Sequence, residues 1–171
     1  MPTPTLTLDI QITAPAWRRI PHLCARLQRA AQVTGEHLPT ALRFPATATI
    51  LLASDARVRQ LNFDFRGINK PTNVLSFPQF LPQELRCLKK QKTPANLGDI
   101  ALAYGRLVSE AKNEGKRPID HATHLVIHGL LHLFGYDHVQ EKDAKRMEKA
   151  ETEIMKALNL SNPYASSERR R

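Results

Sequence analysis

The chain has 171 residues, of which 42% are hydrophobic and 24% charged, and its formal net charge is +9. This length and composition predict one globular domain with a sizeable core and exclude a fibrous or disordered chain. The first ten residues lack a positive region and an apolar run, and residues 122–136 are too short for a membrane span, so neither a signal peptide nor a membrane segment is expected. Cys24 and Cys87 match neither a disulfide framework nor a C-x-x-C motif, which favours a reducing, cytoplasmic setting.

The first part of the chain predicts two strands, each followed by a helix. Residues 5–12 alternate polar and apolar side chains, as a half-buried strand does. A helix should then run from Pro21 to about Thr34, with Gly35 ending it. Residues 47–53 form a short, mostly apolar strand. Ser54 and Asp55 are of the N-cap type, and Val58 and Leu61 predict a short amphipathic helix before Arg66 and Gly67.

The middle of the chain predicts an edge strand and an exposed loop. Residues 73–77 lie between Pro71 and Pro78, and prolines at both limits favour a strand at the edge of a sheet. Residues 79–96 show no clear periodicity, so we expect an exposed loop there. This segment is basic, with four cations close together: Arg86, Lys89, Lys90 and Lys92.

The last part of the chain predicts one strand, over residues 99–104, and then mainly helices. Three helices should follow, over residues 106–114, 118–134 and 141–158. Residues 165–171 end in three arginines and predict a disordered basic tail. The whole pattern predicts a single α+β domain over residues 1–164, in which a small mixed four-stranded sheet packs against about five helices.

The most specific motif is H-G-L-L-H-L-F-G-Y-D-H at residues 128–138. His128 and His132 stand at positions i and i+4 of a predicted helix, so one nitrogen of each can point at a common atom. Gly135 can end that helix and reverse the chain, which would bring His138 beside the first two. Three neutral imidazoles with an open fourth position are typical of a catalytic zinc site. We therefore predict one divalent ion per chain, zinc, held by these three histidines.

The alternative for each histidine is a hydrogen-bonded core residue, because the surrounding helix is largely apolar. Three histidines at ligand spacing, with a glycine at the turn, favour the metal instead. His121 and His124 lie on the same face of the helix, but one tetrahedral ion does not need two further histidine ligands. We interpret them as structural, with substrate contact or orientation of a ligand as the alternative. Asp137 is interpreted as a helix-terminus cap, with a general base or ligand-orienting group as the alternative.

One position in this zincin-like metal-site helix limits the reactions that the site can catalyse. Metzincin proteases carry H-E-x-x-H-x-x-G-x-x-H, with the glutamate as general base. This chain keeps the spacing but has Gly129 at the position of the glutamate. Because glycine cannot transfer a proton to a leaving amine, the sequence argues against proteolysis. Bound zinc still lowers the pKa of water to about 7, which can be enough where the leaving group is an alkoxide.

The positive charge lies outside the metal-site segment. Residues 101–160 hold nine Lys and Arg against nine Asp and Glu, so the excess is carried by the rest of the chain. Such an excess is a hint of a polyanionic partner, because neutralising phosphates releases counterions. From the charge alone, a nucleic-acid partner and the lack of one are equally open.

The histidine motif and the segment R-G-x3-P-T-N-V-L-S-F-P at residues 66–78 together resemble the YbeY family of metal-dependent endoribonucleases. The similarity extends over about residues 45–164 and includes L-G-D-I at residues 97–100. It implies a zinc-type ion on the three histidines and places the family's arginine at Arg66. It also implies a single-strand-preferring endoribonuclease in late 16S rRNA 3′-end maturation and 70S ribosome quality control. The implied partners are ribosomal RNA and the ribosome or its small subunit, with no membrane and no DNA.

Arg66 also suits this chemistry by its residue type. Phosphodiester cleavage needs cationic stabilisation of a developing phosphorane, and arginine is an always-charged, bidentate phosphate binder. The alternative is a solvent-exposed turn residue. Two other classes of function stay open: a metallohydrolase acting on another bond, and a non-catalytic ribosome-associated RNA-binding protein with a structural metal.

Overall fold

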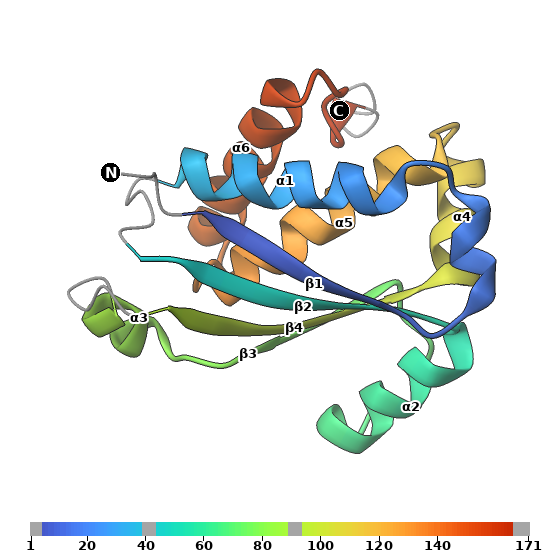
Figure 1. Cartoon of the computed structure of the whole chain (residues 1–171), viewed down its shortest axis with the longest axis horizontal. Helices are drawn as coiled ribbons and strands as arrows, with labels where there is room; N and C mark the ends of the chain where they lie inside the picture. Colours follow the sequence, from blue (N-terminus) through green and yellow to red (C-terminus); the bar gives the residue numbers. More distant parts are fainter. Residues whose placement is uncertain (1–4, 39–43, 89–93, 166–171) are drawn as a thin grey trace.

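One mixed sheet organises the computed structural model, which describes residues 5–38, 44–88 and 94–165. Its strands are β1 (Leu6–Ile12), β2 (Ala46–Ala53), β3 (Val74–Pro78) and β4 (Ala95–Ala103). Their order is β1-β2-β4-β3, with β1, β2 and β4 parallel and β3 antiparallel to β4 (Figure 1). The predicted edge position of the proline-bounded strand is confirmed, because β3 pairs only with β4 among the described strands.

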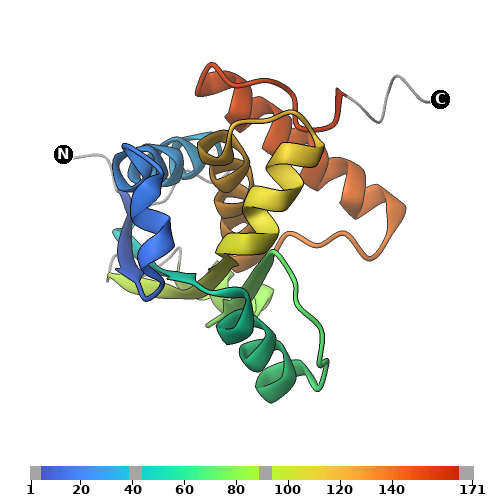
Figure 2. The same ribbon diagram turned by 90° about the vertical axis from the view of Figure 1, so that its right-hand side faces the viewer.

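Six α-helices and one 3-10 helix, Pro15–Arg19, surround this sheet in the described part of the chain. The α-helices are α1 (Leu23–His37), α2 (Asp55–Arg66), α3 (Pro82–Leu88), α4 (Tyr104–Asn113), α5 (Pro118–Leu133) and α6 (Glu141–Ala157). Helices α1, α5 and α6 lie over one face of the sheet and α2 lies on the other (Figures 1 and 2). The α+β class and the four-stranded mixed sheet are confirmed, with six α-helices described where about five were expected.

Helix α5 is the central helix of the fold. Val126, Leu130 and Leu133 on α5 join the core that packs on the sheet. Ile127 and Leu131 join a second core, made with α1 and α6. Hydrophobic contacts therefore hold α5 from two sides, which leaves one narrow strip of the helix for polar side chains.

Two predictions about local structure are wrong. Gly35 does not end the first helix, which continues to His37, and Gly35 is buried inside it. Tertiary packing there outweighs the cost of about 1 kcal/mol that glycine imposes on a helix. Residues 82–88 are a helix instead of part of a loop, because Leu85 is buried in the main core. The Glu84 carboxylate also accepts a hydrogen bond from the Leu81 N–H at the helix start.

Several expectations concern residues outside the described ranges. Lys89, Lys90 and Lys92 of the basic segment lie there, as do residues 166–171 of the expected tail. Arg86 is described and is exposed. Cys24 and Cys87 are both exposed and free. None of the helices that the structure describes is long and apolar enough to cross a membrane.

Candidate metal centre

His128 and His132 lie one turn apart on the polar strip of α5. Their Nε2 atoms are 3.1 Å apart. The Nδ1 atom of His128 is 2.6 Å from Glu151 Oε1, and the Nδ1 atom of His132 is 3.0 Å from the Tyr136 carbonyl oxygen. Both of these partners only accept hydrogen bonds, so each Nδ1 carries a proton. In the neutral form of the two rings the Nε2 lone pairs face each other, an arrangement that a cation satisfies.

The chain reversal after α5 brings His138 to the same place. Gly135 has a φ of 87°, in the left-handed region, and its N–H donates to the His132 carbonyl at 2.9 Å. The His138 ring lies 5.6 Å from the His128 ring and 5.0 Å from the His132 ring, centroid to centroid. One nitrogen from each of the three rings falls within 4.8 Å of the other two. This group could therefore hold a metal ion.

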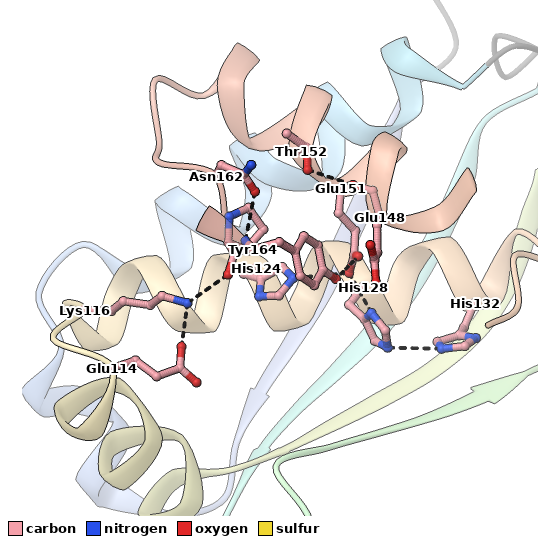
Figure 3. A network of polar contacts seen from close by, with 11 residues as sticks. Glu114, Lys116, His124, His128, His132, Glu148, Glu151, Thr152, Asn162 and Tyr164 are labelled. Atoms are coloured by element: carbon pink, nitrogen blue, oxygen red, sulfur yellow. Dashed lines mark hydrogen bonds and ion pairs between the residues drawn. The ribbon is translucent and has the colours of Figure 1, made fainter. Parts of the chain in front are cut away.

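A buried carboxylate supports the cluster from behind. Glu151 on α6 has an exposed fraction of 0%, and it accepts hydrogen bonds from His128 Nδ1 at 2.6 Å and from His124 Nε2 at 3.2 Å. The Tyr164 hydroxyl donates to the other carboxylate oxygen. Figure 3 shows His124, His128 and Tyr164 converging on this single carboxylate. Carboxylates that hold the second nitrogen of a histidine ligand fix its tautomer and its orientation.

The electrostatics of the site favour a neutral His132 and an ionised Glu151. Burial lowers the pKa of His132, and the neighbouring His128 and His138 lower it further. Burial by itself raises the pKa of Glu151, but the hydrogen bonds from His124 and His128 outweigh it and lower that pKa to about 2. Glu151 is therefore a carboxylate at neutral pH, and burial together with this carboxylate raises the pKa of Tyr164.

A cavity of about 440 Å3 opens in front of the three histidines. Arg66, at the last position of α2, lines it from the other side, although α2 lies on the opposite face of the sheet. The chain turns at Gly67, which has a φ of 69°. The Arg66 guanidinium donates to the Ser76 carbonyl at 3.1 Å, which holds it beside strand β3. The structure thus brings together the predicted cation and the predicted metal ligands around one space.

Comparison with known proteins shows the family of the chain. The family model described as "Endoribonuclease YbeY" matches residues 17–159. A protein of that name from Bradyrhizobium diazoefficiens is 42% identical over 158 residues, which cover 92% of this chain and 84% of that protein. Another, from Chelativorans sp., is 42% identical over 163 residues, which cover 95% of this chain and 96% of the relative. The chain belongs to the YbeY family.

The fold has a solved counterpart as well. The solution structure of a Thermotoga maritima protein matches with a TM-score of 0.54 at 20% sequence identity. The match covers 90% of this chain and 92% of that protein. At this identity the similarity concerns the fold alone.

In this YbeY-family chain, the packing of α5 explains the glycine between the two ligand positions. Gly129 is buried against the sheet, and a Cβ atom there would lie 2.9 Å from Ile100 Cδ1 and 3.1 Å from Ser76 Oγ. A glutamate would displace both neighbours. The position that carries the base in metzincins is used here to bring α5 close to strands β3 and β4.

The other histidines of α5 do not join the cluster. His121 Nε2 lies 2.9 Å from Glu110 Oε2, an oxygen that also accepts from Asn73 Nδ2, and His124 contacts Glu151. The structural interpretation of His121 and His124 agrees with these contacts, and His124 also helps to hold the carboxylate that orients His128. Asp137 lines the cavity and accepts a hydrogen bond from the backbone N–H of His138 at 2.7 Å.

Sequence reasoning missed Glu151 and Tyr164. One signal for Glu151 was available, because Met147, Glu151 and Ile154 share one face of α6 at helical spacing. A carboxylate on an otherwise apolar face requires a polar partner when it is buried. Tyr164 carries no comparable signal, since it follows the last helix in an irregular segment.

Proposed function

We propose that this protein is a metal-dependent endoribonuclease that prefers single-stranded RNA. The proposal assigns the ion to His128, His132 and His138 and identifies it as zinc. We further propose that it acts in late 16S rRNA 3′-end maturation and in 70S ribosome quality control, in the cytoplasm, with the ribosome or its small subunit as partner. The observation that carries the proposal is the cavity shared by three convergent imidazoles and one arginine.

The donor set fits a zinc ion. All three donors are imidazole nitrogens, which suit zinc better than magnesium or calcium. The tautomers required by Glu151 and the Tyr136 carbonyl leave the Nε2 atoms of His128 and His132 without their own protons. When bound, a divalent ion supplies Lewis-acid catalysis at the phosphate.

The residues of the chain itself supply orientation and charge. Glu151 fixes the ring of His128, and the Tyr136 carbonyl fixes that of His132. The Arg66 guanidinium, held by the Ser76 carbonyl, offers further N–H donors to phosphate oxygens across the cavity. Its charge stabilises the negative charge that develops on the phosphoryl oxygens. The absence of a carboxylate at Gly129 fits an alkoxide leaving group, which needs less help from a general acid than an amine does.

A chelator-sensitive cleavage assay on ribosomal RNA tests this function. The protein as purified should cleave a single-stranded 16S 3′-end substrate in preference to a duplex, lose the activity with a strong chelator and regain it with added zinc. Elemental analysis should find one equivalent of zinc, which His132→Ala should strongly reduce. His37→Ala is the matched control, because His37 lies on α1 outside the cluster. Cleavage that survives both chelation and His132→Ala would refute the proposal.

A further inference from the structure

The exposed large hydrophobic side chains of the described residues lie close in sequence to residues that line the cavity. They are Phe63, Phe65, Ile68, Leu81 and Val139. Phe65 and Ile68 lie on either side of Arg66 and Gly67, and Val139 follows His138 directly. Arg66 and His138 both line the cavity. Clustered exposed apolar side chains beside a cavity mark a binding surface, whereas scattered ones need no explanation.

The segments that carry these side chains approach the cavity from two sides. Figure 2 shows the segment after α2 and the segment between α5 and α6 on the same side of the molecule. The first contains Ile68 and Asn73, and the second contains Asp137, His138 and Val139. Because Asn73, Asp137 and His138 line one cavity, the two segments form its rim.

Phe65, which precedes Arg66 on α2, has the most exposed ring among the large hydrophobic side chains of the described residues. Its exposed fraction is 69%, and its ring centroid lies 5.2 Å from that of Phe77 with an interplanar angle of 59°. The Arg66 guanidinium carbon lies 6.0 Å from the same Phe77 ring. Phe65 and Arg66 therefore both lie beside Phe77. The contact with Phe77 restrains the Phe65 ring while most of its surface stays open to a ligand.

This combination fits one kind of ligand, an unpaired nucleobase. Nonspecific single-strand binding sites combine a cation for the backbone phosphate with an aromatic ring on which the base stacks. Arg66 supplies the cation, and Lys70 is a further exposed cation in the segment after α2. Bases inside a duplex are already covered on both faces, so an exposed ring at this position selects unpaired RNA.

We propose that Phe65 is a stacking platform for an unpaired base of the RNA, next to a phosphate bound at Arg66. The inference rests on the proposed function and adds the side chain that gives the cavity its preference for single strands. Ile68 and Val139 extend the apolar rim on either side of the cavity.

Binding measurements on the zinc-loaded protein test this assignment. The ligands are a 2′-O-methyl oligoadenylate, which cannot be cleaved through its 2′-oxygen, and the same strand in a duplex. Phe65→Ala should weaken binding of the single strand by between about fivefold and about 150-fold, which is the range for loss of one stacked base. Binding of the duplex should change little. Phe65→Leu is the matched control, because it keeps apolar contact with Phe77 but offers no ring, and it should lose as much affinity as Phe65→Ala.

A gain-of-signal variant makes the test independent of lost affinity. Trp17 is the one tryptophan of the chain and has an exposed fraction of 1%. Phe65→Trp should keep the affinity for the single strand, and its added fluorescence should be quenched on binding, with wild type as the blank. Wild-type affinity in Phe65→Ala, full affinity in Phe65→Leu, or no quenching in Phe65→Trp would each overturn the inference while leaving the proposed function standing. If wild type bound and cleaved no RNA, the proposed function would fail first and this inference with it.

Discussion

Glu151 on α6 accepts a hydrogen bond from Nδ1 of His128 on α5 at 2.6 Å. The two residues are 23 positions apart in the chain, and their contact joins α6 to the helix that carries the candidate metal ligands. Because Tyr164 donates to the same carboxylate, the segment after α6 takes part in orienting His128 as well. The metal centre therefore depends on groups that do not touch the cavity.

Removing the charge at Glu151 should weaken metal binding. In Glu151→Gln the side chain can no longer accept from His124, His128 and Tyr164 together, because one of its two oxygens becomes an amide donor. Loss of such a partner typically costs between about tenfold and about 100-fold in metal affinity. The zinc Kd can be measured by competition with a chromophoric chelator. Glu153→Gln, on the exposed side of the same helix, is the control and should bind zinc as wild type does; equal affinities in both variants would contradict the role of Glu151.

Truncation of Arg66 should affect catalysis more than stability. The side chain is exposed and donates a hydrogen bond to the Ser76 carbonyl, so Arg66→Ala should keep the fold and the metal. Loss of a charged contact to the transition state costs on the order of 3 kcal/mol, or about 100-fold in rate. Single-turnover cleavage at saturating RNA measures this loss directly. Arg59→Ala, on the same helix, should cleave at nearly the wild-type rate, and a wild-type rate in Arg66→Ala would make Arg66 a surface residue.

The ion pair between Arg26 on α1 and Asp120 on α5 should make stability depend on pH. Burial alone would raise the pKa of Asp120, but hydrogen bonds from Arg117 and Arg26 outweigh it and lower that pKa below its usual 3.8. Because the carboxyl pKa is lower in the folded state, the ionised carboxylate stabilises the fold at pH values above the pKa of the unfolded state. This stabilisation is lost as the pH falls through the pKa of the folded state. Arg26→Ala should therefore lower the free energy of unfolding by about 1 kcal/mol at neutral pH.

Urea unfolding at a series of pH values checks this dependence. The difference between wild type and Arg26→Ala should be full at about pH 6, above the unfolded pKa of the carboxyl group, and should shrink as the pH falls through its lowered folded pKa. Arg29→Ala, at an exposed position of the same helix, is the control and should show little difference at any pH. A difference for Arg26→Ala that does not change with pH would mean that lost packing, and not the ion pair, explains it.

The basic segment Arg86, Lys89, Lys90 and Lys92 should bind RNA phosphate independently of the metal centre. Each lost phosphate contact lowers the slope of log affinity against log salt by about one unit. Replacing the four cations with glutamine should weaken RNA binding and flatten its salt dependence, while the metal content stays at the wild-type level. Affinity across a salt series measures both effects. If the curves of the two proteins coincided, these four cations would not contact RNA and their charge would serve another purpose.

The sequence by itself determined the features that depend on neighbouring residues. The i and i+4 spacing of His128 and His132 and the left-handed turn at Gly135 lie within one short segment, so backbone geometry alone predicts that the three histidines meet. The alternation in β1 and the prolines around β3 are equally local, and they correctly predicted a half-buried strand and an edge strand.

Tertiary structure decided everything that joins distant segments. The packing of α6 on α5 selects Glu151 as the partner of His128, and the course of the chain around β3 brings Arg66 to the cavity. The same dependence explains the two wrong local predictions, because burial of Leu85 stabilises α3 and packing around Gly35 extends α1. These contacts gain their free energy from surface buried between elements, and local sequence patterns do not record which elements will meet.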